Sequence, residues 1–354
     1  MHRNILVVLI ISVVLGTLIV VSSHHWFTLW VGLEMNTLSI LPIISYQFTP
    51  RNVESSVKYF LIQSISAGFL LNVVVIQAWL YSSWSLGNPL NEVTSFLITF
   101  ALGLKLGLFP CHYWFPDVIQ GVGFLQGLVL STWQKIAPFV IILSIIESLS
   151  TNLIIIMGAM SVLVGGWGGL NQTQVRKMLA FSSIAHMGWI CSTIVYSTSV
   201  SCIMLIVYIF INSSVFLIVN NMSLSSLSSL SRLPFYSFVG GFGLVISILS
   251  LGGLPPLLGF LIKFISLHVL VSNGSFLLCS ILVIGSLLSL FYYLRIAFNS
   301  SLLLFPQHLL LLFSWRNGLG NQSGLTLEGI FLSISIGVSL LGLFCFPIFI
   351  SLLN

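Results

Sequence analysis

Charged side chains inside long apolar segments constrain this chain more than any other feature. Lys105, Lys135, Lys263 and Glu34 each lie roughly 14–18 Å along a membrane-length segment, at about 1.5 Å per residue. The hydrocarbon core of a bilayer is about 30 Å thick, so each charge lies near its middle. A charge there costs at least about 2.5–3.5 kcal/mol, and such residues commonly mark a proton or ion pathway. These four residues are therefore the first candidates for function.

The composition indicates an integral membrane protein. Of the 354 residues, 57% are hydrophobic and only 5% are charged, whereas a soluble domain carries about 25% charged residues. The net charge of +5 comes from scattered basic residues, which does not indicate nucleic-acid binding. The five cysteines stand apart in apolar sequence. Their spacing predicts neither a metal site nor a disulfide framework.

Apolar runs separated by polar turns predict an all-α polytopic membrane protein of about 11 transmembrane helices. Two of the runs are too long for a simple span and are interrupted, one at 107–110 and one at 252–256. Both interruptions contain glycine and proline, and proline breaks a helix because it lacks a backbone N–H. The predicted spans are 4–22, 25–47, 57–81, 93–121, 123–147, 151–170, 175–197, 201–221, 236–272, 275–297 and 326–350.

The basic residues in the loops and at the ends of these spans all fall on one side of the membrane. The opposite side carries only Glu92 and Glu147. Basic loops face the cytoplasm or matrix, so the N-terminus is predicted on that side and the C-terminus on the other. The basic residues are Arg3, Arg51, Lys58, Arg176, Lys177, Arg232, Arg295 and Arg316.

The two interrupted spans are five spans apart and so cross the membrane in opposite directions. Inverted repeats with discontinuous helices are a transporter architecture. We therefore predict one transmembrane domain, 1–354, with a possible inverted repeat relating spans 25–147 and 175–297. The apolar run 302–313 is too short to span and predicts an interfacial helix.

The buried charges suggest how protons could move. Burial disfavours the charged form of a lysine and a nearby carboxylate favours it, so Glu34 and Lys105 suit a buried ion pair whose separation controls the proton on Lys105. Lys135 has no obvious carboxylate at its depth and is the best proton carrier. His186 can relay protons through either ring nitrogen. Static pairs that only hold helices together are the alternative, but three lysines cannot all be neutralised by one deep carboxylate.

Five sequence blocks carry a specific family resemblance. Together they resemble the NADH dehydrogenase subunit 2 family, the mitochondrially encoded, antiporter-like membrane subunits of respiratory complex I. The likeness runs from about residue 20 to 300 and is weak beyond it. The blocks are FTLWVGLEMN at 27–36, KLGLFPCHYWFPD at 105–117, TWQKIAP at 132–138, SSIAHMGW at 182–189 and LGGLPPLLGFLIK at 251–263.

The resemblance implies an antiporter-like helix bundle in the mitochondrial inner membrane, with the N-terminus in the matrix. It implies that Glu34 and Lys105 form a modulating pair and that Lys135 is a central proton-carrying lysine. Lys263 would be the lysine of the second broken helix, His186 would lie on the hydrophilic axis between them, and all five would serve proton transfer. It also implies partners among the other membrane-arm subunits and bound lipids. NADH, FMN, iron–sulfur clusters and ubiquinone would be bound by partner subunits, and this chain would bind no cofactor or metal.

Two other functions remain open from the sequence. A stand-alone cation/proton antiporter would have the same bundle and lysines, although a single deep carboxylate is a poor sodium site. A purely structural membrane subunit would use the buried charges as fixed pairs. The preferred reading is a proton-translocating subunit of NADH:ubiquinone oxidoreductase that has no active site of its own.

Overall fold

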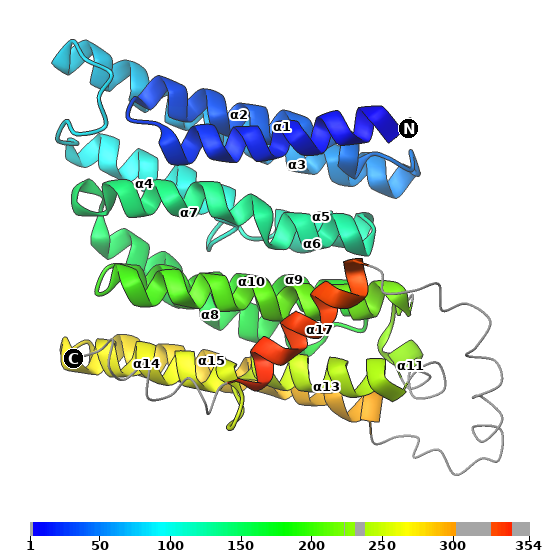
Figure 1. Ribbon diagram of the computed structural model, residues 1–354. Helices are drawn as coiled ribbons and strands as arrows, with labels where there is room; N and C mark the ends of the chain where they lie inside the picture. The colour runs from blue at the N-terminus through cyan, green and yellow to red at the C-terminus, as the bar shows by residue number, and fades with distance from the viewer. Residues whose placement is uncertain (1–2, 223, 231–237, 302–326, 342–354) are drawn as a thin grey trace, which may run out of the picture. The chain divides into compact units, whose positions relative to one another are not determined.

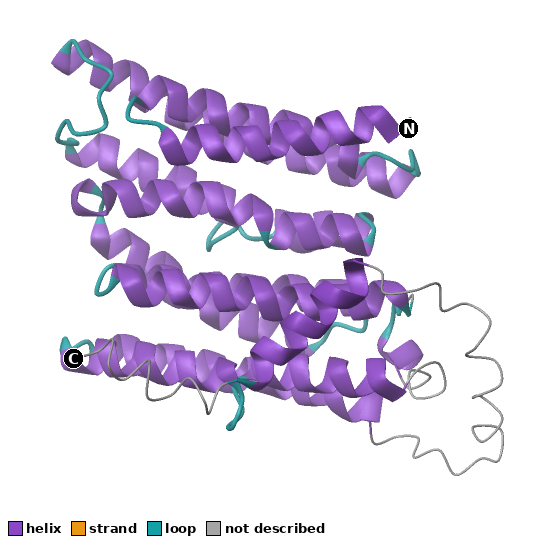
Figure 2. Cartoon of the chain, in the orientation of Figure 1, coloured by secondary structure: helices purple, strands orange, loops and turns teal. Residues whose placement is uncertain are grey.

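The computed structural model describes residues 3–222, 224–230, 238–301 and 327–341. Within these ranges the regular structure is helical and no strand forms (Figure 2). Seven of the described helices are long and apolar enough to cross a membrane. The prediction of an all-α polytopic membrane protein is therefore confirmed.

The chain divides into two compact units, and the first comprises Met1–Val164 and His186–Thr198. In this unit α1 packs on α2, α2 on α3, α3 on both α4 and α5, and α7 on α1 and α4 (Figure 1). Its helices are α1 (Arg3–Ser22), α2 (Trp26–Ile44), α3 (Pro50–Tyr81), α4 (Glu92–Leu106), α5 (Trp114–Gly121), α6 (Phe124–Ser131), α7 (Trp133–Ile145) and the short η1 (Ile146–Ser148).

The second unit comprises Gly165–Ala185 and Ser199–Asn354. In it α13 packs on α14, α15 and α17, and α14 also packs on α15. Two long helices, α8 (Thr151–Leu170) and α9 (Val175–Ile194), contribute to both units. The other helices of this unit are α10 (Thr198–Asn221), α11 (Leu227–Leu230), α13 (Phe238–Gly252), α14 (Leu258–Ser272), α15 (Phe276–Ser301) and α17 (Leu327–Leu340).

The described helices follow the predicted spans with three differences. Helix α3 begins at Pro50, before the predicted start at 57, and the short α11 lies between two predicted spans. The span predicted over 123–147 is divided into α6 and α7 at Thr132, whose φ and ψ are −116° and −70°. No glycine or proline marks this position, so a break there could not be predicted. The interfacial helix predicted over 302–313 lies outside the described residues, as do 342–350 of the last predicted span.

Both predicted helix interruptions are present, and both begin with the same hydrogen-bonded cap. After α4, Gly107 has a φ of 73°, and the Leu108 amide donates to the Gly103 carbonyl at 2.9 Å. After α13, Gly253 has a φ of 79°. There the Leu254 amide donates to the Leu249 carbonyl at 3.2 Å. Glycine suits the left-handed conformation that ends a helix in this way. The inverted repeat itself stays a prediction.

Small residues allow α1 and α2 to approach closely. A Cβ atom placed on Gly32 would lie 2.8 Å from Val20 Cγ2 and 3.1 Å from the Gly16 carbonyl oxygen. A Cβ atom on Gly16 would lie 3.0 Å from the Gly32 carbonyl oxygen. Glycine pairs of this kind bring membrane helices into backbone contact, so this contact positions α2 and the polar residues that it carries.

We expect Gly32→Ala to destabilise the protein by about 1–3 kcal/mol, because an added methyl group must push α1 and α2 apart. The thermal stability of the detergent-solubilised assembly measures this change. Gly68→Ala is the matched control, since a Cβ atom on Gly68 meets nothing within 4 Å. Equal stability of the two variants would contradict this account of the contact.

Candidate functional site

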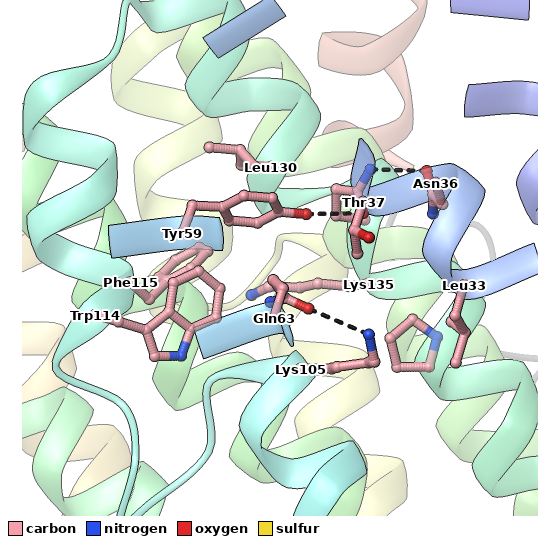
Figure 3. A pocket seen from close by; sticks show the side chains of 12 residues that line it. Leu33, Asn36, Thr37, Tyr59, Gln63, Lys105, Trp114, Phe115, Leu130 and Lys135 are labelled. Atoms are coloured by element: carbon pink, nitrogen blue, oxygen red, sulfur yellow. Dashed lines mark hydrogen bonds between the residues drawn. The ribbon is translucent and has the colours of Figure 1, made fainter. Parts of the chain in front are cut away.

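Lys105 and Lys135 both line one cavity in the first unit (Figure 3). Its volume is about 20 Å³, which is roughly room for one water molecule. Apolar and aromatic side chains line the cavity together with polar ones, so the two lysine ammonium groups lie in a poorly solvated environment. The lining residues are Leu33, Asn36, Thr37, Tyr59, Gln63, Lys105, Trp114, Phe115, Leu130, Gln134, Lys135 and Pro138.

Lys105 lies in the last turn of α4 and is buried, with 6% of its surface exposed. Its ammonium donates to Gln63 Oε1 of α3 at 3.5 Å (Figure 3). The last turn of a helix favours a positive charge, because unpaired carbonyl groups point out of that end. The break after Leu106 therefore creates the position that this lysine occupies.

Amide side chains connect three helices around the cavity. Gln134 of α7 donates from Nε2 to Asn36 Oδ1 of α2 at 2.9 Å. The Tyr59 hydroxyl of α3 donates to Gln134 Oε1 at 3.5 Å. Buried polar groups are normally hydrogen-bonded, and these bonds fix the orientation of Gln134, the residue that precedes Lys135.

Lys135 is buried in α7, with 3% of its surface exposed. Its ammonium lies 4.7 Å from the centre of the Phe115 ring, a distance at which a cation is attracted to a ring face. Pro138 lies inside the same helix. Because proline has no N–H, it leaves the carbonyl group of Gln134 without its helical donor. Proline thus removes one helical hydrogen bond from the turn that carries Lys135.

Glu34 lies at the edge of this cavity and does not line it. Its carboxylate accepts a hydrogen bond from Thr37 Oγ1 at 3.3 Å, and Thr37 lines the cavity. Among the described residues there are two salt bridges, which join Lys58 to Glu54 and to Asp117. The expected direct pair between Glu34 and Lys105 is therefore not formed here. Lys105 is held by the neutral Gln63 amide instead.

Lys263 belongs to a separate site in the second unit. It lies in α14, and its ammonium reaches back across the helix break to donate to the carbonyl groups of Leu251 and Gly252, each at 3.1 Å. These carbonyl groups are the end of α13. A Cβ atom on Gly253 would lie 3.0 Å from Lys263 Cδ and 3.2 Å from Nζ, so this glycine also leaves space for the lysine.

His186 lies in α9, in the part of that helix that belongs to the first unit. The same part carries the buried Cys191. Lys105 and Lys135 are thus brought to one cavity, and Glu34 to its edge. The roles that the sequence assigned to these residues and to Lys263 and His186 stay predictions.

Sequence reasoning missed the amide and phenol groups of the cavity. Gln63 and Tyr59 are four residues apart on α3 and so lie on one face of that helix. Gln134 directly precedes Lys135. Uncharged polar residues inside an apolar span are the signal that could have found them.

The fold and the site define the class of the protein: a multi-pass, antiporter-like membrane bundle with lysines at the breaks of two discontinuous helices. Solved structures of two bacterial complexes share the fold. A chain of respiratory complex I from Thermus thermophilus with bound aureothin matches with a TM-score of 0.83 and 24% identity, covering 98% of this chain and 80% of that chain. A chain of the Mrp complex from a Dietzia species matches with a TM-score of 0.77 and 18% identity, covering 82% and 59%.

Sequence comparison gives the family. The family model described as "NADH:quinone oxidoreductase/Mrp antiporter, TM" matches residues 23–289, and the model described as "NADH dehydrogenase subunit 2 C-terminus" matches residues 290–350. The NADH-ubiquinone oxidoreductase chain 2 of Patiria pectinifera is 74% identical over all 354 residues of both chains. That of Pisaster ochraceus is 57% identical over 98% of each chain. This chain belongs to the NADH-ubiquinone oxidoreductase chain 2 family.

The family match extends the resemblance seen in the sequence motifs. The likeness was weak beyond about residue 300, where the second model now matches up to residue 350. The C-terminal region therefore belongs to the same family as the bundle that precedes it, and the predicted family is confirmed.

Gly253→Ala should destabilise the α13–α14 break by about 1–2 kcal/mol, because its φ of 79° is unfavourable for a residue with a Cβ atom. The added methyl group should also displace Lys263. Thermal melting of the solubilised assembly reports the first effect. Gly252→Ala is the matched control, since its Cβ atom would make ordinary contacts of 3.6–3.9 Å with Tyr293. An unchanged melting temperature in Gly253→Ala would contradict this role of the glycine.

Proposed function

We propose that this chain translocates protons as a membrane-arm subunit of NADH:ubiquinone oxidoreductase. The observation that carries the proposal is the shared cavity of Lys105 and Lys135, two buried lysines with polar neighbours and a carboxylate at the edge. Two positive charges in one poorly solvated cavity repel each other strongly. Protonation of one lysine therefore opposes protonation of the other, which is the property that a proton-transfer step needs.

The proposed cycle begins with the distance between Glu34 and Lys105. When the carboxylate approaches, it compensates the Lys105 ammonium and weakens the repulsion that this charge exerts on Lys135, so Lys135 can take up a proton. When the carboxylate withdraws, the uncompensated Lys105 charge drives the proton off Lys135. The amide network and one water molecule provide hydrogen-bonding groups along the cavity.

Lys263 is proposed to carry the proton further, with His186 on the way. The carbonyl groups of Leu251 and Gly252 hold the Lys263 ammonium at the end of α13. Hydrogen bonds to a charged group are worth about 1.5–3 kcal/mol each, which is comparable to the cost of a charge at this depth. Lys263 can therefore stay protonated until a neighbouring charge displaces its proton.

The proposal also includes the partners, the location and the orientation of the chain. The other membrane-arm subunits of the complex are its partners, and the mitochondrial inner membrane is its location. The one-sided distribution of loop basic residues supports an N-terminus on the matrix side and a C-terminus on the opposite side. We propose that this subunit holds no redox group, and that the chemistry of NADH, flavin, iron–sulfur clusters and ubiquinone belongs to partner subunits.

Lys135→Met should abolish proton pumping through this subunit, because methionine keeps an unbranched side chain of similar length but cannot bind a proton. The measurement is the number of protons moved per NADH oxidised by membrane vesicles containing the variant complex. Lys58→Met is the control, since 43% of the Lys58 side-chain surface is exposed and exposed ion pairs contribute only about 0–1 kcal/mol. A normal proton yield from assembled Lys135→Met complex would sink the proposed role.

Native electrophoresis of mildly solubilised membranes should place this chain in a very large band that oxidises NADH. An in-gel stain for NADH oxidation locates the active band, and detection of the chain in the same gel shows whether the two positions coincide. Migration as a small species without this activity would instead favour the stand-alone antiporter, whose fold the Mrp structure shares.

A further inference from the structure

The ammonium of Lys105 has an uncharged partner in a position where a carboxylate was expected. Lys105 Nζ donates to Gln63 Oε1 at 3.5 Å, and both side chains are buried. Glu34 is occupied with Thr37. In the proposed cycle Lys105 must leave the carboxylate for part of the time, and in this structure its ammonium lies against Gln63.

We propose that Gln63 is a positioning residue that holds the protonated Lys105 while it is separated from Glu34. This inference rests on the proposed function, because it assigns a partner to one of the two states of Lys105. Lys105 then has two alternative acceptors, the Gln63 amide and the Glu34 carboxylate. Exchange between them is the step that alters the charge felt by Lys135.

The chemistry of an amide suits this task. Its oxygen accepts a hydrogen bond from the ammonium, so the lysine keeps a defined position. The amide carries no net charge, however, so the ammonium remains uncompensated and continues to repel a proton on Lys135. A carboxylate at position 63 would remove that repulsion, and an apolar side chain would leave the ammonium without an acceptor.

The fold holds Gln63 in place from α3. Tyr59 lies one helical turn before Gln63 and is bonded to Gln134 of α7, so the same face of α3 contacts both the lysine helix α4 and the helix that carries Lys135. Figure 3 shows the Gln63 side chain directed toward Lys105. A movement of α3 relative to α4 would therefore change the Gln63–Lys105 contact directly.

The chain offers a matched control on the same helix. Gln77 is also a buried glutamine of α3, but its Nε2 donates to Thr94 Oγ1 at 3.3 Å and contacts no lysine. Gln63→Met and Gln77→Met each remove one buried amide from α3. We expect the first to lower the number of protons pumped per NADH at least several-fold and the second to leave it unchanged in assembled complex.

Gln63→Glu separates positioning from packing, because glutamate has nearly the same shape. A carboxylate at position 63 would compensate the Lys105 ammonium and weaken its repulsion of a proton on Lys135, so release of the Lys135 proton would need a higher pH. We expect the alkaline limit of the pumping-rate profile to move to higher pH, with a lower proton yield at neutral pH. A role in packing alone predicts an unchanged profile.

The outcomes distinguish this inference from the function on which it rests. Normal proton yield in Gln63→Met, together with lost pumping in Lys135→Met, would overturn the role of Gln63 and leave the proposed function intact. Normal pumping in both variants would overturn the function itself. Equal loss in Gln63→Met and Gln77→Met would assign the effect to α3 packing and also overturn the inference.

Discussion

The stabilisation of an ammonium group inside a membrane is the constraint on which the rest of this structure depends. A lysine at the centre of a continuous apolar helix would face lipid or packed side chains at a cost of several kcal/mol. Here Lys105 lies in the last turn of α4, and Lys263 donates to the last carbonyl groups of α13. The C-terminal ends of helices supply the negative partial charge that an ammonium needs. The same arrangement of a helix end and a lysine therefore occurs at each of the two broken helices.

That arrangement explains why glycine is required at the breaks. Gly107 and Gly253 both adopt the left-handed conformation that ends a helix in mid-membrane, and unwound backbone at this depth persists only where protein groups or water satisfy it. Lys263 meets part of this requirement in the second unit by bonding the exposed carbonyl groups. The lysine stabilises the break while the break stabilises the lysine, which couples local folding to the charge state of the site.

The parts of this protein that could be predicted from sequence are those set by single residues with strong physical effects. The breaks were predicted from Gly107, Pro110 and Gly253. The candidate site was predicted from charged residues in apolar runs. The division at Thr132 carried no such signal, because an ordinary residue there adopts a local conformation set by its surroundings. The partner of Lys105 could not be predicted either, since the choice between Glu34 and Gln63 depends on how three helices pack.

The choice of an amide over a carboxylate at the Lys105 contact also bears on how the site works. A permanently bonded ion pair would stabilise the fold, but its two charges would cancel and Lys135 would sense little change from Lys105. A neutral acceptor gives the ammonium a position without cancelling its field, and the low polarity around the cavity transmits that field effectively. In the proposed mechanism Glu34, at the edge and bonded to Thr37, would be the variable element. A fixed neutral partner for Lys105 and a movable charged one would make Lys105 respond to Glu34, and a signal at the edge of the cavity would then reach the proton on Lys135.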